Sequence, residues 1–189
     1  MKKFAFIAAL IFASCTGGND TQKTEQAIDE LMEAYAKERT KPYDDITAEY
    51  DKRKDCLSIE MDGKMLNACY EVYYKDLLTD NPSSYAKSFL ISMVLFDPEV
   101  KMVYNMEFKI DGISFKVSPS MVNKYNNSIA LGFSSGESYY KAIELISHIN
   151  VNADIWLNTN KGKIEIPYHD VTNLQAMAIS YRMDGGTFE

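Results

Sequence analysis

The sequence predicts an α+β fold with one domain over residues 24–189. Three observations lead to this prediction. Segments that alternate between apolar and polar residues around short turns are typical of antiparallel β-hairpins. Two stretches with apolar residues three and four positions apart predict helices, one between the later hairpins and one after them. A helical N-terminal part, residues 24–55, precedes a hairpin-rich remainder, residues 56–189, which is the order expected of an α+β protein.

The first residues have the features of an export signal. Two lysines precede an unbroken apolar or small run over residues 4–14, FAFIAALIFAS. This run is too short to span a bilayer as a helix and has the length of a cleavable signal segment. It ends at Ala13-Ser14-Cys15, which resembles the lipobox of bacterial lipoproteins, although Phe12 stands where leucine is usual.

The lipobox resemblance implies how the N-terminus is processed. Residues 1–14 would be removed as a signal peptide, and diacylglycerol would be attached to the thiol of Cys15. The polar, glycine-containing residues 15–23 suit a flexible tether between the lipid and the folded domain.

Two helices are expected in the N-terminal part. Apolar residues between Ile28 and Tyr35 share one stripe of an amphipathic helix over residues 23–38. Pro42 ends or kinks this helix because proline lacks an amide hydrogen. The charged residues 44–54 contain few apolar side chains and are expected to form a surface helix.

A hairpin is predicted at Asp62-Gly63, a dipeptide typical of two-residue turns. This register places Cys56 opposite Cys69 at a position where Cα atoms approach to about 4.5 Å. A disulfide between the two is expected, since an exported chain meets an oxidising compartment. The alternative for this segment is a helix over residues 64–78.

The middle of the chain contains the clearest strand signals. The continuous apolar residues 89–96 predict a buried strand. Residues 104–117 predict a hairpin that turns at Asp111-Gly112, with apolar pairs on one face and opposite charges on the other. The pairs are Met106–Val117, Phe108–Phe115, Ile110–Ile113, Glu107–Lys116 and Lys109–Ser114.

A short strand over residues 129–133 is expected to lead into a helix over residues 135–149. Ser134 and Glu137 have the spacing of a capping box, in which the serine hydroxyl accepts a hydrogen bond from the start of the helix.

The last segment predicts a hairpin over residues 154–168 and a terminal helix. A four-residue loop at 159–162 pairs Leu157 with Ile164 and Ile155 with Ile166. Asp170 is expected to cap the last helix, which ends at two glycines. Its apolar stripe contains Leu174, Met177, Ala178 and Tyr181.

The composition limits the classes of partner. The net charge is −7, and loss of the leader lysines makes the mature chain more acidic. Phosphate contacts need clustered Lys and Arg, so nucleic acid is not an expected partner. The chain is expected to be anchored by lipid in the outer or inner membrane, facing the periplasm or the surface, with an envelope or exported protein as its partner.

One motif has the pattern of a catalytic serine. Residues 132–136 read G-x-S-x-G, the nucleophile elbow of serine hydrolases, and His148, His169, Asp154 and Asp170 follow. Few residues remain after this motif for the parallel strands of a hydrolase sheet, so Ser134 is expected to be a cap. His169 and Asp170 are too few to form a zinc site, and no metal or cofactor is expected.

Aromatic residues are abundant, with 13 Tyr and 9 Phe. Each is expected to fill the core, although together they leave room for a protein-binding face. Two clusters stand out, namely Tyr70, Tyr73 and Tyr74, and Tyr139 and Tyr140.

The leading hypothesis is a non-enzymatic envelope lipoprotein that binds another macromolecule, as an inhibitor, immunity-like protein or accessory subunit. The alternatives are a small hydrolase that uses Ser134 and a carrier of a small apolar ligand. The order hairpin, helix, hairpin, helix near the C-terminus resembles small exported proteins of the invasion-associated locus B family. That resemblance rests on no motif, and no residue role is transferred.

Overall fold

The computed structural model describes residues 26, 28–30, 32–34, 36–37, 45–51, 53–54, 56–75 and 83–189. The predicted signal peptide, the lipidation site Cys15 and the tether lie outside the described residues. No helix in the described ranges is both long and apolar enough to cross a membrane.

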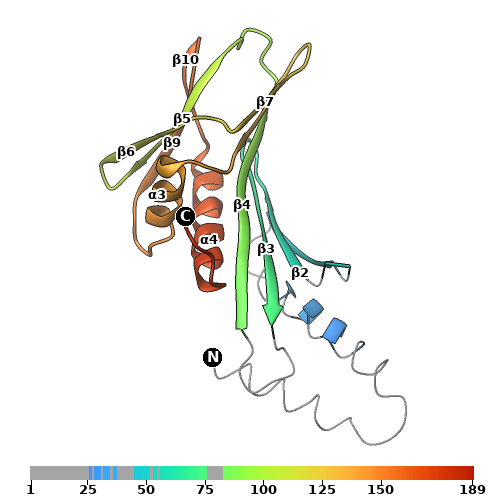
Figure 1. Cartoon of the computed structure of the whole chain (residues 1–189). Coiled ribbons are helices and arrows are strands. Elements are labelled where there is room, and N and C mark those ends of the chain that lie inside the picture. Colours follow the sequence, from blue (N-terminus) through green and yellow to red (C-terminus); the bar gives the residue numbers. More distant parts are fainter. Residues whose placement is uncertain are drawn as a thin grey trace, which may run out of the picture.

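Two antiparallel sheets confirm the predicted α+β class (Figure 1). The first sheet has six strands in the order β1-β2-β3-β4-β8-β7, and the second has four in the order β10-β9-β5-β6. In the first sheet the bounds are β1 Ile46–Asp51, β2 Cys56–Asp62, β3 Asn67–Lys75, β4 Ser83–Leu95, β7 Met121–Lys124 and β8 Ile129–Phe133. In the second they are β5 Val103–Ile110, β6 Ile113–Val117, β9 Ala153–Thr159 and β10 Gly162–Glu165.

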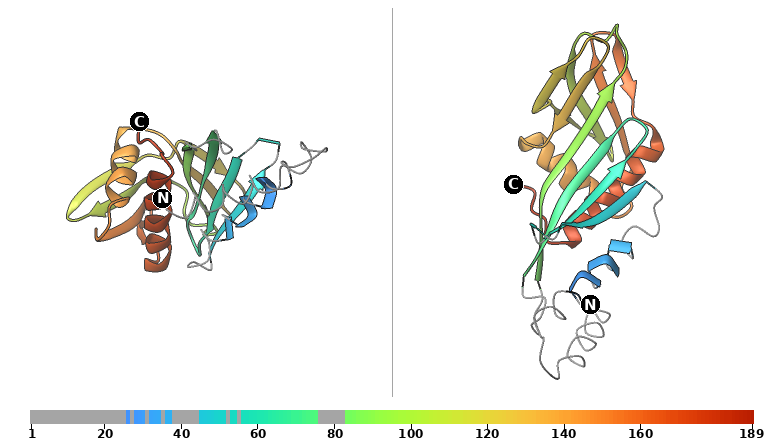
Figure 2. Two further views of the ribbon diagram at one scale, coloured as in Figure 1. Left: turned by 90° about the horizontal axis from the view of Figure 1, so that it is seen from below. Right: turned by 90° about the vertical axis from the view of Figure 1, so that its right-hand side faces the viewer.

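Two helices connect the sheets into one core. Helix α3 spans Glu137–Ile146 and packs on β5 and β6, whereas α4 spans Tyr168–Met183 and contacts strands of both sheets. Both views in Figure 2 show these helices beside the first sheet. The predicted stripe of α4 is confirmed, because Leu174, Met177, Ala178 and Tyr181 are all buried.

The N-terminal part is only partly helical. Described residues between 26 and 37 are helical, and Met32 and Ala36 are buried. The second predicted helix is wrong, because β1 occupies this segment and pairs with β2. Ile46, Ala48 and Tyr50 alternate with polar residues on one face, which is the period of a strand.

The hairpin between β2 and β3 exists, but its predicted register is wrong. The turn comprises residues 63–66, so Cys56 faces Tyr73 and Cys69 faces Glu60. The two cysteines are free and stand four residues apart along the strands. That separation is roughly 13 Å, beyond the reach of a disulfide. The alternative helix is also wrong, because β3 occupies its segment.

A distant side chain explains this register. The buried carboxylate of Asp170 accepts hydrogen bonds from the amides of Lys64, Met65 and Leu66 at 2.8–3.1 Å. Gly63 is required beside it, since a Cβ there would lie 2.4 Å from the carbonyl oxygen of Leu66. Asp170 therefore does not cap α4, whose N-cap residue is Pro167.

The remaining strand predictions are confirmed. β4 and β8 contain the two predicted strands, although β4 ends at Leu95 and is buried on one face only, since Val94 and Phe96 are exposed. β5 pairs with β6 in the predicted register. β9 pairs with β10 as expected, with Leu157 opposite Ile164, although the pairing continues to Thr159 and Gly162. This shortens the turn to Asn160 and Lys161.

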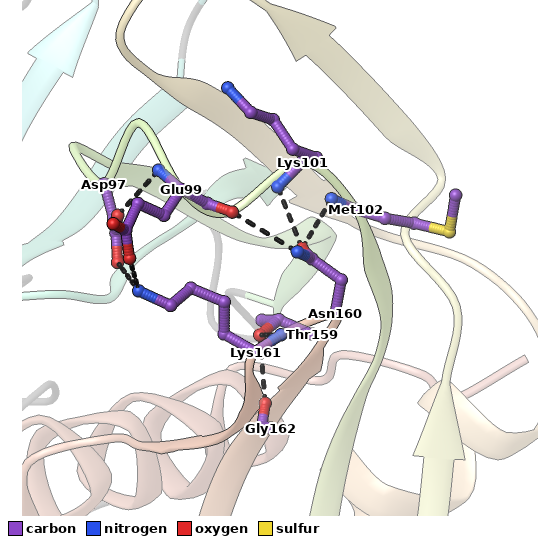
Figure 3. A network of polar contacts seen from close by, with 8 residues as sticks. All are labelled: Asp97, Glu99, Lys101, Met102, Thr159, Asn160, Lys161 and Gly162. Atoms are coloured by element: carbon purple, nitrogen blue, oxygen red, sulfur yellow. Dashed lines mark hydrogen bonds and ion pairs between the residues drawn. The ribbon is translucent and has the colours of Figure 1, made fainter.

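The β9–β10 turn also forms hydrogen bonds with the segment that connects β4 of the first sheet to β5 of the second (Figure 3). The Asn160 side-chain oxygen accepts hydrogen bonds from the amides of Lys101 and Met102 at 2.8 and 2.9 Å. Its amide group donates to the carbonyl oxygen of Glu99 at 3.2 Å. The neighbouring Lys161 ammonium forms an exposed ion pair with Glu99. The connection from β4 to β5 is thereby fixed against the second sheet.

The predicted capping role of Ser134 is wrong. Helix α3 begins at Glu137 with Gly136 as its N-cap residue, and no side chain caps it. The chain leaves β8 in an extended segment, which places Ser134 two residues too early. Its hydroxyl lies 3.1 Å from that of Ser120 instead.

Candidate functional site: a groove along the edge of β4

The strand β4 is paired along only half of its outer edge. On one side it pairs with β3, and on the other Ile91–Leu95 pairs with β8. Within the described ranges no strand pairs with residues 83–90 on that second side. Figures 1 and 2 both show the long strand continuing beyond the sheet region that β8 covers.

A β-bulge marks the change from the paired to the unpaired half. The register between β3 and β4 shifts around Tyr70, where Ser88 and Phe89 together oppose one residue. Ser88 has φ 60°, a left-handed conformation that is unfavourable for a residue with a Cβ. The bulge redirects the strand, and the hydroxyl of Tyr139 in α3 donates to the carbonyl oxygen of Phe89 at 2.8 Å.

A groove of about 910 Å³ follows this edge. Five consecutive residues of β4, Ala86 to Leu90, line it. Ala86 and Phe89 are buried on the inner face of the sheet whereas Lys87 is exposed, so a groove that touches all three reaches around the strand edge. Tyr139 and Tyr140 of α3 and the C-terminal residues 187–189 form further walls.

Aromatic side chains form the floor of the groove. Tyr70 stacks on Phe89 with ring centroids 6.0 Å apart, and Tyr181 meets both rings edge-on. Phe188 packs edge-on against Tyr181 at 5.5 Å. The predicted tyrosine clusters therefore divide, because Tyr70 and Tyr139 are buried in the core whereas Tyr140 is partly exposed at the groove.

Charged groups stand on the side of the groove formed by the first sheet. Lys54 and Glu71 form an ion pair at 3.0 Å. The Tyr73 hydroxyl donates to Glu71 at 2.7 Å, and this hydrogen bond together with Lys54 lowers the pKa of the carboxyl. The same bond raises the pKa of Tyr73 to about 12. Glu60 is exposed at the groove, and no lysine or arginine among the described residues forms an ion pair with it.

Lys87 lies where the edge meets this charged side. Its ammonium is 4.9 Å from the ring centroid of Tyr85 and 5.5 Å from that of Tyr73. The two rings stack across β3 and β4 at 5.5 Å. The groove therefore offers flat aromatic surface, the exposed carboxylates of Glu60 and Glu189, and lysines already engaged by rings or carboxylates.

The thiol of Cys69 and the phenols of Tyr139 and Tyr181 in the groove stay in their neutral forms. Burial, reinforced by Glu60 and Glu71, raises the pKa of the Cys69 thiol. Burial likewise raises the pKa values of Tyr139 and Tyr181. Protonated thiols and phenols are weak nucleophiles, so these groups are suited to contact and hydrogen bonding rather than to attack.

The residues of the serine-hydrolase pattern do not come together. Ser134 lines the groove, but neither histidine does. His148 contacts Arg182, and His169 contacts Asp45 and Asn173. Asp170 is committed to the β2–β3 turn. No cluster of three or more potential metal ligands occurs in the described part of the chain.

Comparisons of the chain with protein-family models, with curated proteins and with solved structures give no match.

Proposed function

We propose that this chain is a non-enzymatic lipoprotein of the cell envelope whose domain binds another protein in the groove beside β4. One observation carries the proposal, namely that five consecutive residues of a half-unpaired strand line an aromatic groove. Tyrosine and phenylalanine provide large contact area at little entropic cost, which is why they dominate protein-binding sites.

The rest of the chain supports a protein partner. The acidic charge favours a basic partner, and lipid attachment at Cys15 would hold the domain at the membrane. The acidic charge and the membrane attachment suit an inhibitor, an immunity-like protein or an accessory subunit of an envelope complex.

The volume of the groove also supports the second candidate, a carrier of a small apolar ligand, because pockets for small ligands have volumes of about 300–1,000 Å³. The charged groups favour the protein instead. Burying the exposed Glu60 carboxylate and Lys87 ammonium under a wholly apolar molecule removes both charges from water without giving them new hydrogen bonds.

Quantitative affinity capture tests the proposal. The full chain and its Tyr140→Ala variant are used as bait in envelope extract, and captured proteins are quantified by mass spectrometry. Tyr168→Ala serves as the control, because Tyr168 is exposed and lies outside the groove. We expect a protein that wild type and the control retain and the Tyr140 variant loses. Equal capture by all three baits contradicts the proposal.

A further inference from the structure

We propose that the groove binds its partner as an extended, basic peptide segment that adds a strand to the unpaired half of β4. This inference rests on the proposed function and specifies the form and charge of the partner at that site.

The backbone of β4 supplies the first argument. A strand with a neighbour on one side only directs about half of its amide and carbonyl groups to the free edge. Residues 83–90 form such an edge in the described structure, with a length of roughly 26 Å. An extended segment beside it would occupy the position that β8 vacates after Phe133 and would satisfy these groups by ladder hydrogen bonds.

The surroundings leave the middle of this edge open. At one end, the carbonyl oxygen of Phe89 already accepts a hydrogen bond from the hydroxyl of Tyr139. At the other end the C-terminal segment lies against β4, since a Cβ on Gly185 would lie 2.9 Å from the carbonyl oxygen of Ser84. Between these two contacts, Ala86, Lys87 and Ser88 line the groove. The added strand is therefore short and confined in register.

The bulge and Lys87 disfavour pairing of this edge with a second copy of the chain. Bulges and edge lysines are the devices by which natural sheets prevent edge-to-edge association. Ser88 holds the bulge in a left-handed conformation, and Lys87 places a positive charge on the edge. A flexible peptide segment can adapt its backbone to the bulge and to the Lys87 side chain, whereas the rigid edge of an identical sheet cannot.

Charge complementarity defines the occupant. The carboxylates of Glu60, Glu71 and Glu189 line the groove, against the two lysines Lys54 and Lys87. Lys54 is paired with Glu71 and Lys87 lies over tyrosine rings, whereas no lysine or arginine among the described residues pairs with exposed Glu60. The chain as a whole carries −7. Alternate side chains of an added strand point to opposite faces, so the segment would direct aromatic or aliphatic residues to the Tyr140 side and Lys or Arg to the Glu60 side.

A displayed library of random ten-residue peptides tests the inference. The full chain, purified in detergent, is panned against the library, and enriched peptides are synthesised for affinity measurements. We expect enriched sequences with Lys or Arg and without central proline. Glu60→Lys should weaken their binding by about tenfold, the loss of one favourable interaction. Glu165→Lys on exposed β10 is the matched control and should leave affinity unchanged.

Backbone methylation distinguishes strand addition from side-chain docking. Each amide of an enriched peptide is N-methylated in turn, which removes one hydrogen-bond donor. Strand addition predicts losses of about tenfold at alternate positions and little change between them. It also predicts slower hydrogen exchange, when peptide is bound, at those amides of residues 86–88 that point to the free edge.

The outcomes separate this inference from the proposed function. Peptides that depend on Tyr140 but show no two-residue alternation overturn strand addition and leave the groove as a binding site. Binding that Tyr140→Ala does not weaken overturns both. If no displayed peptide binds, strand addition is overturned, and the proposed function is decided by the capture experiment.

Discussion

Asp170 joins parts of the chain that are more than one hundred residues apart in sequence. Its buried carboxylate accepts three backbone hydrogen bonds from the β2–β3 turn, and its position in the first turn of α4 adds a favourable interaction with the helix dipole. One side chain thus fixes both the turn and the position of the helix against the first sheet.

We expect Asp170→Asn to lower the free energy of unfolding by about 2–3 kcal/mol, because the amide group turns a donor toward backbone donors and removes the charge. Urea denaturation followed by circular dichroism measures this change. Asp154→Asn, on an exposed position of β9, is the control and should change stability by less than about 0.5 kcal/mol. Equal effects of the two substitutions would show that the turn does not depend on Asp170.

The reactivity of Cys69 reports on the groove. Burial and two neighbouring carboxylates raise the pKa of this thiol, so only a small fraction is thiolate at neutral pH. Alkylation by iodoacetamide is expected to be slow at pH 7 and to keep rising above about pH 9. Cys56, which is 1% exposed, should react only after unfolding.

Mass spectrometry at intervals gives the two alkylation rates. A rate for Cys69 that levels off below about pH 8 would mean that its thiol is not desolvated. Protein that takes up no label even when unfolded without reductant would mean that the cysteines form a disulfide, contrary to the register of β2 and β3.

At the scale of elements, sequence patterns were reliable where the determining contacts are local. The β5–β6 hairpin was predicted to the residue because Asp111 and Gly112 both adopt positive φ and the flanking pairs agree in charge and burial. β1 was missed because its alternation spans only three partly apolar residues among many charges. This segment forms a strand because it pairs along one edge with β2.

The β2–β3 register shows what local signals omit. The dipeptide Asp62-Gly63 predicts a two-residue turn, but Leu66 is fully buried, and Asp170 accepts hydrogen bonds from its amide and from the two amides before it. The turn therefore lengthens to four residues, and every partner moves by four positions. The position of Ser134 has a similar origin, since capping spacing alone does not reveal how far the chain extends after β8.

The β9–β10 turn provides a prediction at this scale. Asn160→Ala removes three hydrogen bonds to the segment that joins the two sheets and should cost about 1–2 kcal/mol. Lys161→Ala removes only exposed ion pairs, with Glu99 and Asp97, and should change stability little. Thermal melts of both variants check this order, and a larger loss for Lys161→Ala would contradict it.

At the scale of the whole molecule, the groove is built from segments that no sequence pattern connects. β2, β3, β4, α3 and the C-terminal residues each contribute to it. The sequence did indicate abundant tyrosine, but it did not indicate which tyrosines are exposed. β4 has thirteen residues whereas its neighbour β8 has five. This difference in length indicates that part of the β4 edge is unpaired.

The proposed membrane location depends on lipid attachment at Cys15. We expect Cys15→Ser to move the protein from the membrane fraction to the soluble periplasm, or to leave it unprocessed. The reason is that the lipobox resemblance implies lipid attachment to the thiol of Cys15. Fractionation and immunoblotting measure this. Processing and fractionation like those of wild type would contradict lipidation.

The central claim, that the groove beside β4 receives another protein, is tested most directly by cross-linking in living cells. A photoreactive benzoylphenylalanine is placed at Tyr140 in the groove and, separately, at exposed Tyr168 outside it. After irradiation the account predicts one discrete adduct with another protein from position 140 and none from position 168. The same adducts from both positions, or none from position 140, would contradict it.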